Sequence, residues 1–88
     1  MGSFGFGKSY TKNDLDREIA KLRELYVRAM GNSNAQTKKE LAMQLHKVLE
    51  VCKKGGFNGS ETVEWPTPGS YTSLRNVTPS VQVMIEMM

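Results

Sequence analysis

The sequence predicts a mainly α-helical protein built on an antiparallel pair of helices, at about residues 13–30 and 35–54. Two segments repeat their apolar residues with the period of a helix, a loop of about four residues separates them, and a Gly-Gly pair ends the second. A loop this short favours an antiparallel helical hairpin. We therefore expect a flexible, aromatic and Gly-containing N-terminal arm (1–12), the hairpin (13–57) and an extended C-terminal arm (58–88).

The first helix is predicted from apolar residues spaced by three or four positions, namely Leu15, Ile19, Leu22, Tyr26 and Ala29. Leu25 and Met30 widen this apolar stripe. Asn13 is the expected N-cap, because acidic residues follow it in the first turn, where the helix dipole favours negative charge. Gly31 is expected to end the helix in the left-handed conformation.

The second helix carries the same spacing in Leu41, Leu45, Val48 and Cys52. Two capping boxes can start it, one pairing Ser33 with Gln36 and the other Thr37 with Glu40, and the sequence does not decide between them. Gly55-Gly56 ends this helix, and Phe57 is placed for the hydrophobic contact of a Schellman motif.

The C-terminal arm is expected to contain one or two short strands or a short terminal helix. Residues 62–65 alternate polar and apolar, which predicts a strand with Val63 and Trp65 on one face. Thr78-Pro79 can begin a helix, with Thr78 as N-cap. Residues 81–88 fit a strand by their β-branched content and a helix by their Met content, so both readings stay open.

A chain of 88 residues buries a small core, and two amphipathic helices do not complete one alone. A third layer is therefore required. It is supplied by the C-terminal arm or by another subunit, and we expect both.

No catalytic machinery is recognisable in the sequence. Residues 2–9 match the phosphate-loop pattern, but only Met1 precedes them, so the strand that such a loop requires is missing. The one cysteine, Cys52, and the one histidine, His46, point about 120° apart on the helical wheel and cannot pair. We expect no enzyme activity, no cofactor and no metal.

Targeting features are equally sparse. The sequence has no apolar run of about 18 residues and no charged segment leading into an apolar one at its start. We therefore expect no membrane partner, no secretion by a classical signal, and a cytoplasmic or virion location.

The leading functional hypothesis is a non-enzymatic assembly protein, a small subunit of a homo-oligomer or of a larger complex. A helical hairpin with docking arms resembles the architecture of virion connector or minor structural proteins, a likeness of architecture alone. The residues expected to dock into neighbouring chains are Phe4, Phe6, Trp65, Tyr71, Val81, Val83, Ile85 and Met87.

Two alternatives remain. The net charge is +3, and phosphate contacts are possible at Lys39, Lys47, Lys53 and Lys54 on the second helix, which predicts a small nucleic-acid-binding or regulatory protein. Glu50 interrupts that basic surface. The other alternative is an inhibitor that binds one host protein through the Met-rich C-terminus, since methionine forms adaptable binding surfaces.

Overall fold

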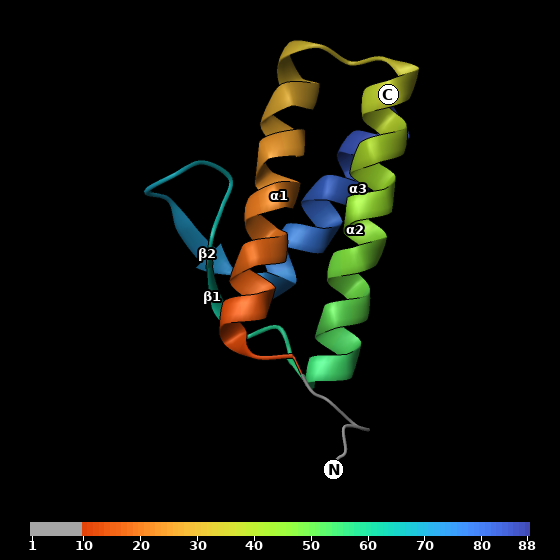
Figure 1. The fold of residues 1–88 in the computed structure, drawn as a ribbon. Coiled ribbons are helices and arrows are strands. Elements are labelled where there is room, and N and C mark those ends of the chain that lie inside the picture. The colour runs from red at the N-terminus through yellow and green to blue at the C-terminus, as the bar shows by residue number, and fades with distance from the viewer. Residues whose placement is uncertain (1–9) are drawn as a thin grey trace.

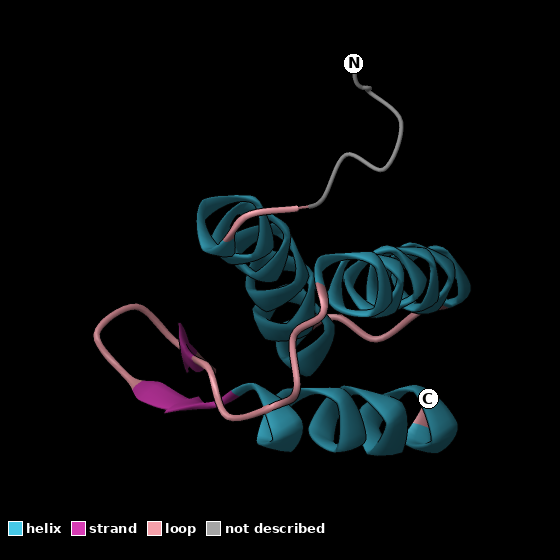
Figure 2. Ribbon diagram, turned by 90° about the horizontal axis from the view of Figure 1, so that it is seen from below, coloured by secondary structure: helices cyan, strands magenta, loops and turns pink. Residues whose placement is uncertain are grey.

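Two long helices lie side by side and antiparallel in the structure, a computed structural model that describes residues 10–88 (Figure 1). They are α1 (Lys12–Gly31) and α2 (Ala35–Gly55). A third helix, α3 (Val77–Met87), runs across one face of this pair and covers it, as the view from below shows (Figure 2). The prediction of a mainly helical fold is confirmed.

Helix α1 is capped two residues earlier than the sequence pattern predicted. Thr11, with an extended backbone, is the N-cap in place of Asn13. The Asp14 amide donates to the Thr11 hydroxyl at 3.2 Å, and the Thr11 amide donates to the Asp14 carboxylate at 2.8 Å. This reciprocal pair is a capping box, which requires an acceptor three residues after the cap. Asn13 is thereby left inside the helix, and Lys12 belongs to α1 and not to the N-terminal arm.

The turn between α1 and α2 also differs from the prediction. Gly31 remains the last helical residue, and Asn32 follows it with φ −155°, so no left-handed residue ends α1. Neither predicted capping box forms at α2. Asn34 is the N-cap, accepting the Thr37 amide at 2.8 Å, while the Ser33 hydroxyl donates back to the Ala29 carbonyl at 2.7 Å.

The end of α2 is the predicted Schellman motif. Gly56 takes the left-handed conformation with φ 71°, and both its amide and that of Phe57 donate to the Cys52 carbonyl. The Phe57 ring lies over Gly55, where a Cβ atom would collide with it. This stop turns the chain back toward α1.

The C-terminal part forms two short strands and also a terminal helix, where the sequence predicted an extended arm with one or two short strands or a short terminal helix. Strands β1 (Thr62–Glu64) and β2 (Tyr71–Ser73) pair antiparallel, with Val63 opposite Thr72. A 3₁₀ turn, η1 (Leu74–Asn76), leads directly into α3. Helix α3 begins at Val77, before the predicted Thr78 cap. Pro79 is tolerated because it lies in the first turn, where backbone amides have no partner within the helix.

One core joins all of these elements. The buried apolar side chains of the hairpin are Leu15, Ile19, Leu22, Ala29, Leu41, Leu45, Val48 and Val51. Those of the C-terminal part are Val63, Trp65, Leu74, Val77 and Val81. Cys52, predicted on the apolar stripe, is only half-buried, and its neighbour Val51 is fully buried instead. The third layer that the hairpin requires is therefore supplied within the chain.

No helix among residues 10–88 is both long enough and apolar enough to cross a bilayer.

Gly56 and Gly31 provide a matched test of the two helix ends. Gly56→Ala should lower the free energy of unfolding by about 1–2 kcal/mol, the cost of a left-handed backbone for a residue with a Cβ. Gly31→Ala should raise it by up to about 1 kcal/mol, because Gly31 is helical and its Cβ would meet no atom within 4 Å. Urea unfolding followed by circular dichroism measures both. Equal effects of the two substitutions would contradict the assigned helix ends.

Candidate protein-interaction surface

Two of the predicted docking residues are part of the core, which corrects the prediction. Trp65 is 4% exposed and its ring contacts that of Tyr26, with centroids 4.8 Å apart and planes at 46°. Val81 is fully buried on the inward side of α3. Trp65 is buried because β1 lies against α1, where the Arg23 guanidinium donates to the Glu64 carbonyl at 3.0 Å. Neither side chain is available to a partner in this fold.

The other predicted docking residues divide between separate places. Val83 and Met87 lie one turn apart on the outward side of α3 and are 53% and 82% exposed. Ile85 is half-buried and packs against the core. Tyr71 is 65% exposed, but it belongs to β2, which lies beside α1 and away from the C-terminal end of α3 (Figure 1). Phe4 and Phe6 lie outside the described residues.

A pocket lined mostly by methionines opens at the C-terminal end of α3. Its volume is about 360 Å³, and we call it the methionine pocket; its lining residues are Ala29, Met30, Ser33, Met84, Met87 and Met88. Met30 comes from the last turn of α1 and is 55% exposed. Met30 was expected on the inward apolar stripe of the first helix and not at a binding surface. The only sequence feature that pointed to the exposure of Met30 was its place next to Ala29 at the end of the predicted helix.

Charge is nearly absent around the outward side of α3. Glu86 is the one charged residue between positions 77 and 87, and the last turn of α3 contains no basic residue. A helix on the surface of a soluble domain normally presents polar side chains outward. Val83 and Met87 in this position therefore form an apolar surface that nothing in the described chain covers.

The predicted basic surface of α2 is partly neutralised. Glu50 forms ion pairs with Lys54 at 3.2 Å and with Lys47 at 3.9 Å. The hydrogen bond from Lys54 is the main cause that holds the pKa of Glu50 below its ordinary value. Lys39 and Lys53 are exposed and make no ion pair within residues 10–88. Two of the four predicted phosphate-binding lysines thus have no ion-pair partner among the described residues.

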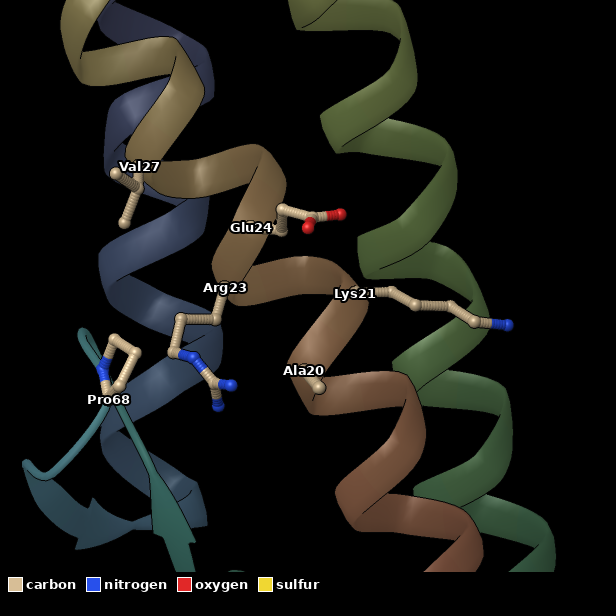
Figure 3. A pocket seen from close by; sticks show the side chains of 6 residues that line it. All are labelled: Ala20, Lys21, Arg23, Glu24, Val27 and Pro68. Atoms are coloured by element: carbon tan, nitrogen blue, oxygen red, sulfur yellow. The ribbon is translucent and has the colours of Figure 1, made fainter.

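A second hollow lies beside the turn of the β-hairpin (Figure 3). It measures about 410 Å³ and is lined by Ala20, Lys21, Arg23, Glu24, Val27 and Pro68. Arg23 extends toward the hairpin, whereas Lys21 and Glu24 point the other way. The Arg23 guanidinium is held by the backbone and the carboxylate of Glu64, at 3.0 and 3.4 Å. The main polar group of this hollow is therefore already engaged by the fold.

The ionisable side chains of the described residues form no recognisable nucleophilic or metal-binding cluster. No group of three or more His, Cys, Asp or Glu side chains gathers among these residues. Partial burial, and secondarily the charge of Glu61, raises the pKa of the Cys52 thiol, which disfavours the reactive thiolate. His46 is exposed on the other side of α2.

Comparison with models of known protein families, with curated proteins and with solved structures finds no match to this chain. Functional inference therefore rests on the surfaces described above. Of these, the outward side of α3 with the adjoining methionine pocket departs most from an ordinary solvated surface.

The burial of Trp65 leads to a prediction that separates a core role from a docking role. Trp65→Ala should lower the free energy of unfolding by about 3–5 kcal/mol, because it leaves a cavity against Tyr26. The matched change Val83→Ala, on the exposed side of α3, should alter stability by no more than about 0.5 kcal/mol. Thermal and urea unfolding provide the measurement. A Trp65→Ala variant of unchanged stability would show that the ring is not buried in solution.

Proposed function

We propose that this protein is a non-enzymatic assembly subunit that associates with further copies of itself through the outward side of α3. The observation that carries the proposal is that α3 has apolar side chains on its exposed side as well as on its buried side. Its buried side fills the core, while Val83 and Met87 face outward. They share the exposed side with Gln82 and Glu86, whose side chains are hydrogen-bonded to each other at 3.4 Å. Contact with another chain would bury the apolar part of this side.

Charge favours a second copy of the chain as the partner. A net charge of +3 opposes self-association wherever basic surfaces meet. The free lysines Lys39 and Lys53 project from the side of α2 opposite its buried stripe, and α3 packs on that buried stripe. Two copies that meet through α3 therefore keep these lysines apart and bring together nearly neutral surfaces. Such a contact is self-complementary, as a two-fold symmetric dimer requires.

The methionine pocket adjoins this surface and suits the same role. Methionine side chains are flexible and polarisable, so they repack readily against a partner. Incorporation into a larger shell or ring, including a virion connector or minor structural role, extends the same proposal through additional contacts such as the exposed Tyr71.

Self-association through α3 predicts that charge placed on its outward side will dissociate the assembly. The wild-type chain should show a mass that is a multiple of 9.9 kDa by light scattering, and Val83→Lys/Met87→Lys should reduce it to 9.9 kDa. The thermal unfolding of the variant monomer should remain cooperative, because both side chains are exposed. Deleting residues 77–88 is a poorer test, since it also removes Val77 and Val81 from the core.

Met43→Lys is the matched control for this experiment. Met43 is 63% exposed on α2 and lies outside the methionine pocket, so charge at this position should leave the mass unchanged. Dissociation by Met43→Lys, or a wild-type chain that stays monomeric at high concentration, would overturn the proposal. The monomer would favour the inhibitor hypothesis, in which the same Met-rich end binds a different protein.

Nucleic-acid binding is the second candidate, and the free charges of Lys39 and Lys53 are the observation that favours it. These residues are separated by four turns of α2 and share its exposed side with His46. Salt bridges do not neutralise them within the described residues. A helix with spaced cations can follow a phosphate backbone.

This second candidate predicts an unequal effect of two charge reversals. Lys39→Glu/Lys53→Glu should weaken salt-dependent retention on DNA or RNA and lower the slope of log affinity against log salt by about 1 for each lost phosphate contact. Lys47→Glu/Lys54→Glu should have a smaller effect, because Glu50 already pairs with both lysines. Filter binding across a salt series measures both. Retention that is absent in the wild-type protein, or equal in both variants, would exclude these contacts.

A further inference from the structure

We propose that the methionine pocket binds a soft monovalent metal ion, Cu(I), through thioether sulfurs. Met30 and the three methionines at the end of α3 line this single pocket, although they come from distant parts of the chain. Met84 and Met88 are one turn apart and face the core, and Met87 lies within about 100° of both on the helical wheel, at the exposed edge of the same arc. Met30 approaches them from the last turn of α1.

The chemistry of the lining selects the metal. Thioether sulfur is a soft ligand that favours Cu(I), whereas Zn²⁺, Mg²⁺ and Ca²⁺ require imidazole, thiolate or oxygen ligands. No side-chain carboxylate, imidazole or thiol belongs to the lining of the pocket. Its one side-chain hydroxyl, that of Ser33, donates to the Ala29 carbonyl at 2.7 Å. Among the lining side chains, the four thioethers are therefore the available ligands, and they favour a soft cation.

The backbone supplies a favourable field for a cation. The pocket lies at the C-terminal ends of α1 and α3, and the negative pole of a helix dipole is at its C-terminus. No basic side chain occupies the last turn of α3. Arg28 lies in the last turn of α1 and pairs with Glu40 at 3.7 Å, and the exposed Lys38 lines the neighbouring hollow together with Met88. The polar environment therefore favours a cation over an anion.

The four ligands differ in their freedom, which predicts an exchangeable site. Met84 and Met88 are half-buried and pack against the core, so the fold already positions them. Met30 and Met87 are largely exposed, and the three rotatable bonds of each let its sulfur reach a bound ion. Binding would then tie the end of α1 to the end of α3. Because the ion contacts the folded state, it should also raise the unfolding temperature.

Titration with Cu(I) under anaerobic, reducing conditions tests the site directly. The wild-type chain should remove one equivalent of Cu(I) from the chromogenic chelator bicinchoninate. The methyl resonances of Met30, Met84, Met87 and Met88 should shift on binding, and that of Met43 should not. Zn²⁺ should cause neither change.

Methionine-to-leucine substitution separates sulfur chemistry from apolar packing, because leucine conserves the volume and removes only the ligand atom. Met30→Leu/Met84→Leu/Met87→Leu/Met88→Leu should abolish Cu(I) binding. Met43→Leu and Cys52→Ala should both retain it. Should the fourfold variant fail to fold, Met30→Leu/Met87→Leu changes only exposed side chains and should still weaken binding.

Three results would overturn the proposal: no competition with bicinchoninate by the wild-type chain, undiminished affinity in both leucine variants, or loss of binding in Cys52→Ala. The last result would place the ion on the thiol. The proposal is independent of self-association, because the leucine variants keep an apolar α3 and should still associate. Val83→Lys should dissociate the assembly and leave Cu(I) binding intact.

Discussion

A helical hairpin leaves the same side of both helices apolar, and covering that side is the constraint on which the rest of this structure depends. Helices α1 and α2 bury part of their apolar stripes against each other, and the rest of the stripes requires a further layer. Everything after Gly56 supplies it. The Schellman motif turns the chain back, β1 places Val63 and Trp65 against α1, and α3 places Val77 and Val81 across the pair.

Interactions that act over a few residues could be predicted from the sequence. The two helical periods and the stop at Gly55-Gly56 with Phe57 depend on contacts within one or two turns, and the structure contains them. The caps were wrong at both helix starts because chemically equivalent candidates stand within a few residues, and only backbone geometry chooses Thr11 and Asn34. The burial of Trp65 could not be predicted from the sequence either. The alternation of polar and apolar residues correctly placed Trp65 on the same face as Val63, but that face is buried only because it packs against α1.

The predicted docking set was only partly correct because the secondary structure of residues 81–88 stayed open in the sequence. The predicted set of Val81, Val83, Ile85 and Met87 takes every second residue, as a strand would. A helix rotates about 100° per residue, so it divides this set, burying Val81 and exposing Val83 and Met87. Eight residues are too few for their pattern to distinguish the two periods. Packing of α3 on the helical hairpin makes the choice, and it places Met30 and Met84 at one pocket, which no local pattern indicates.

Helix α3 both closes the core and presents the candidate surface. The side of the helix on which a substitution lies therefore determines whether it tests folding or association. A change at Val77 or Val81 alters folding, and any effect on association follows from unfolding. A change at Val83 alters only what the outward side can contact. Methionine adds a second distinction, since its side chain both packs and offers a sulfur ligand. Replacement by lysine removes the apolar surface, whereas replacement by leucine removes the ligand alone. The proposed association and the proposed metal binding can therefore be tested separately, although Met87 takes part in both.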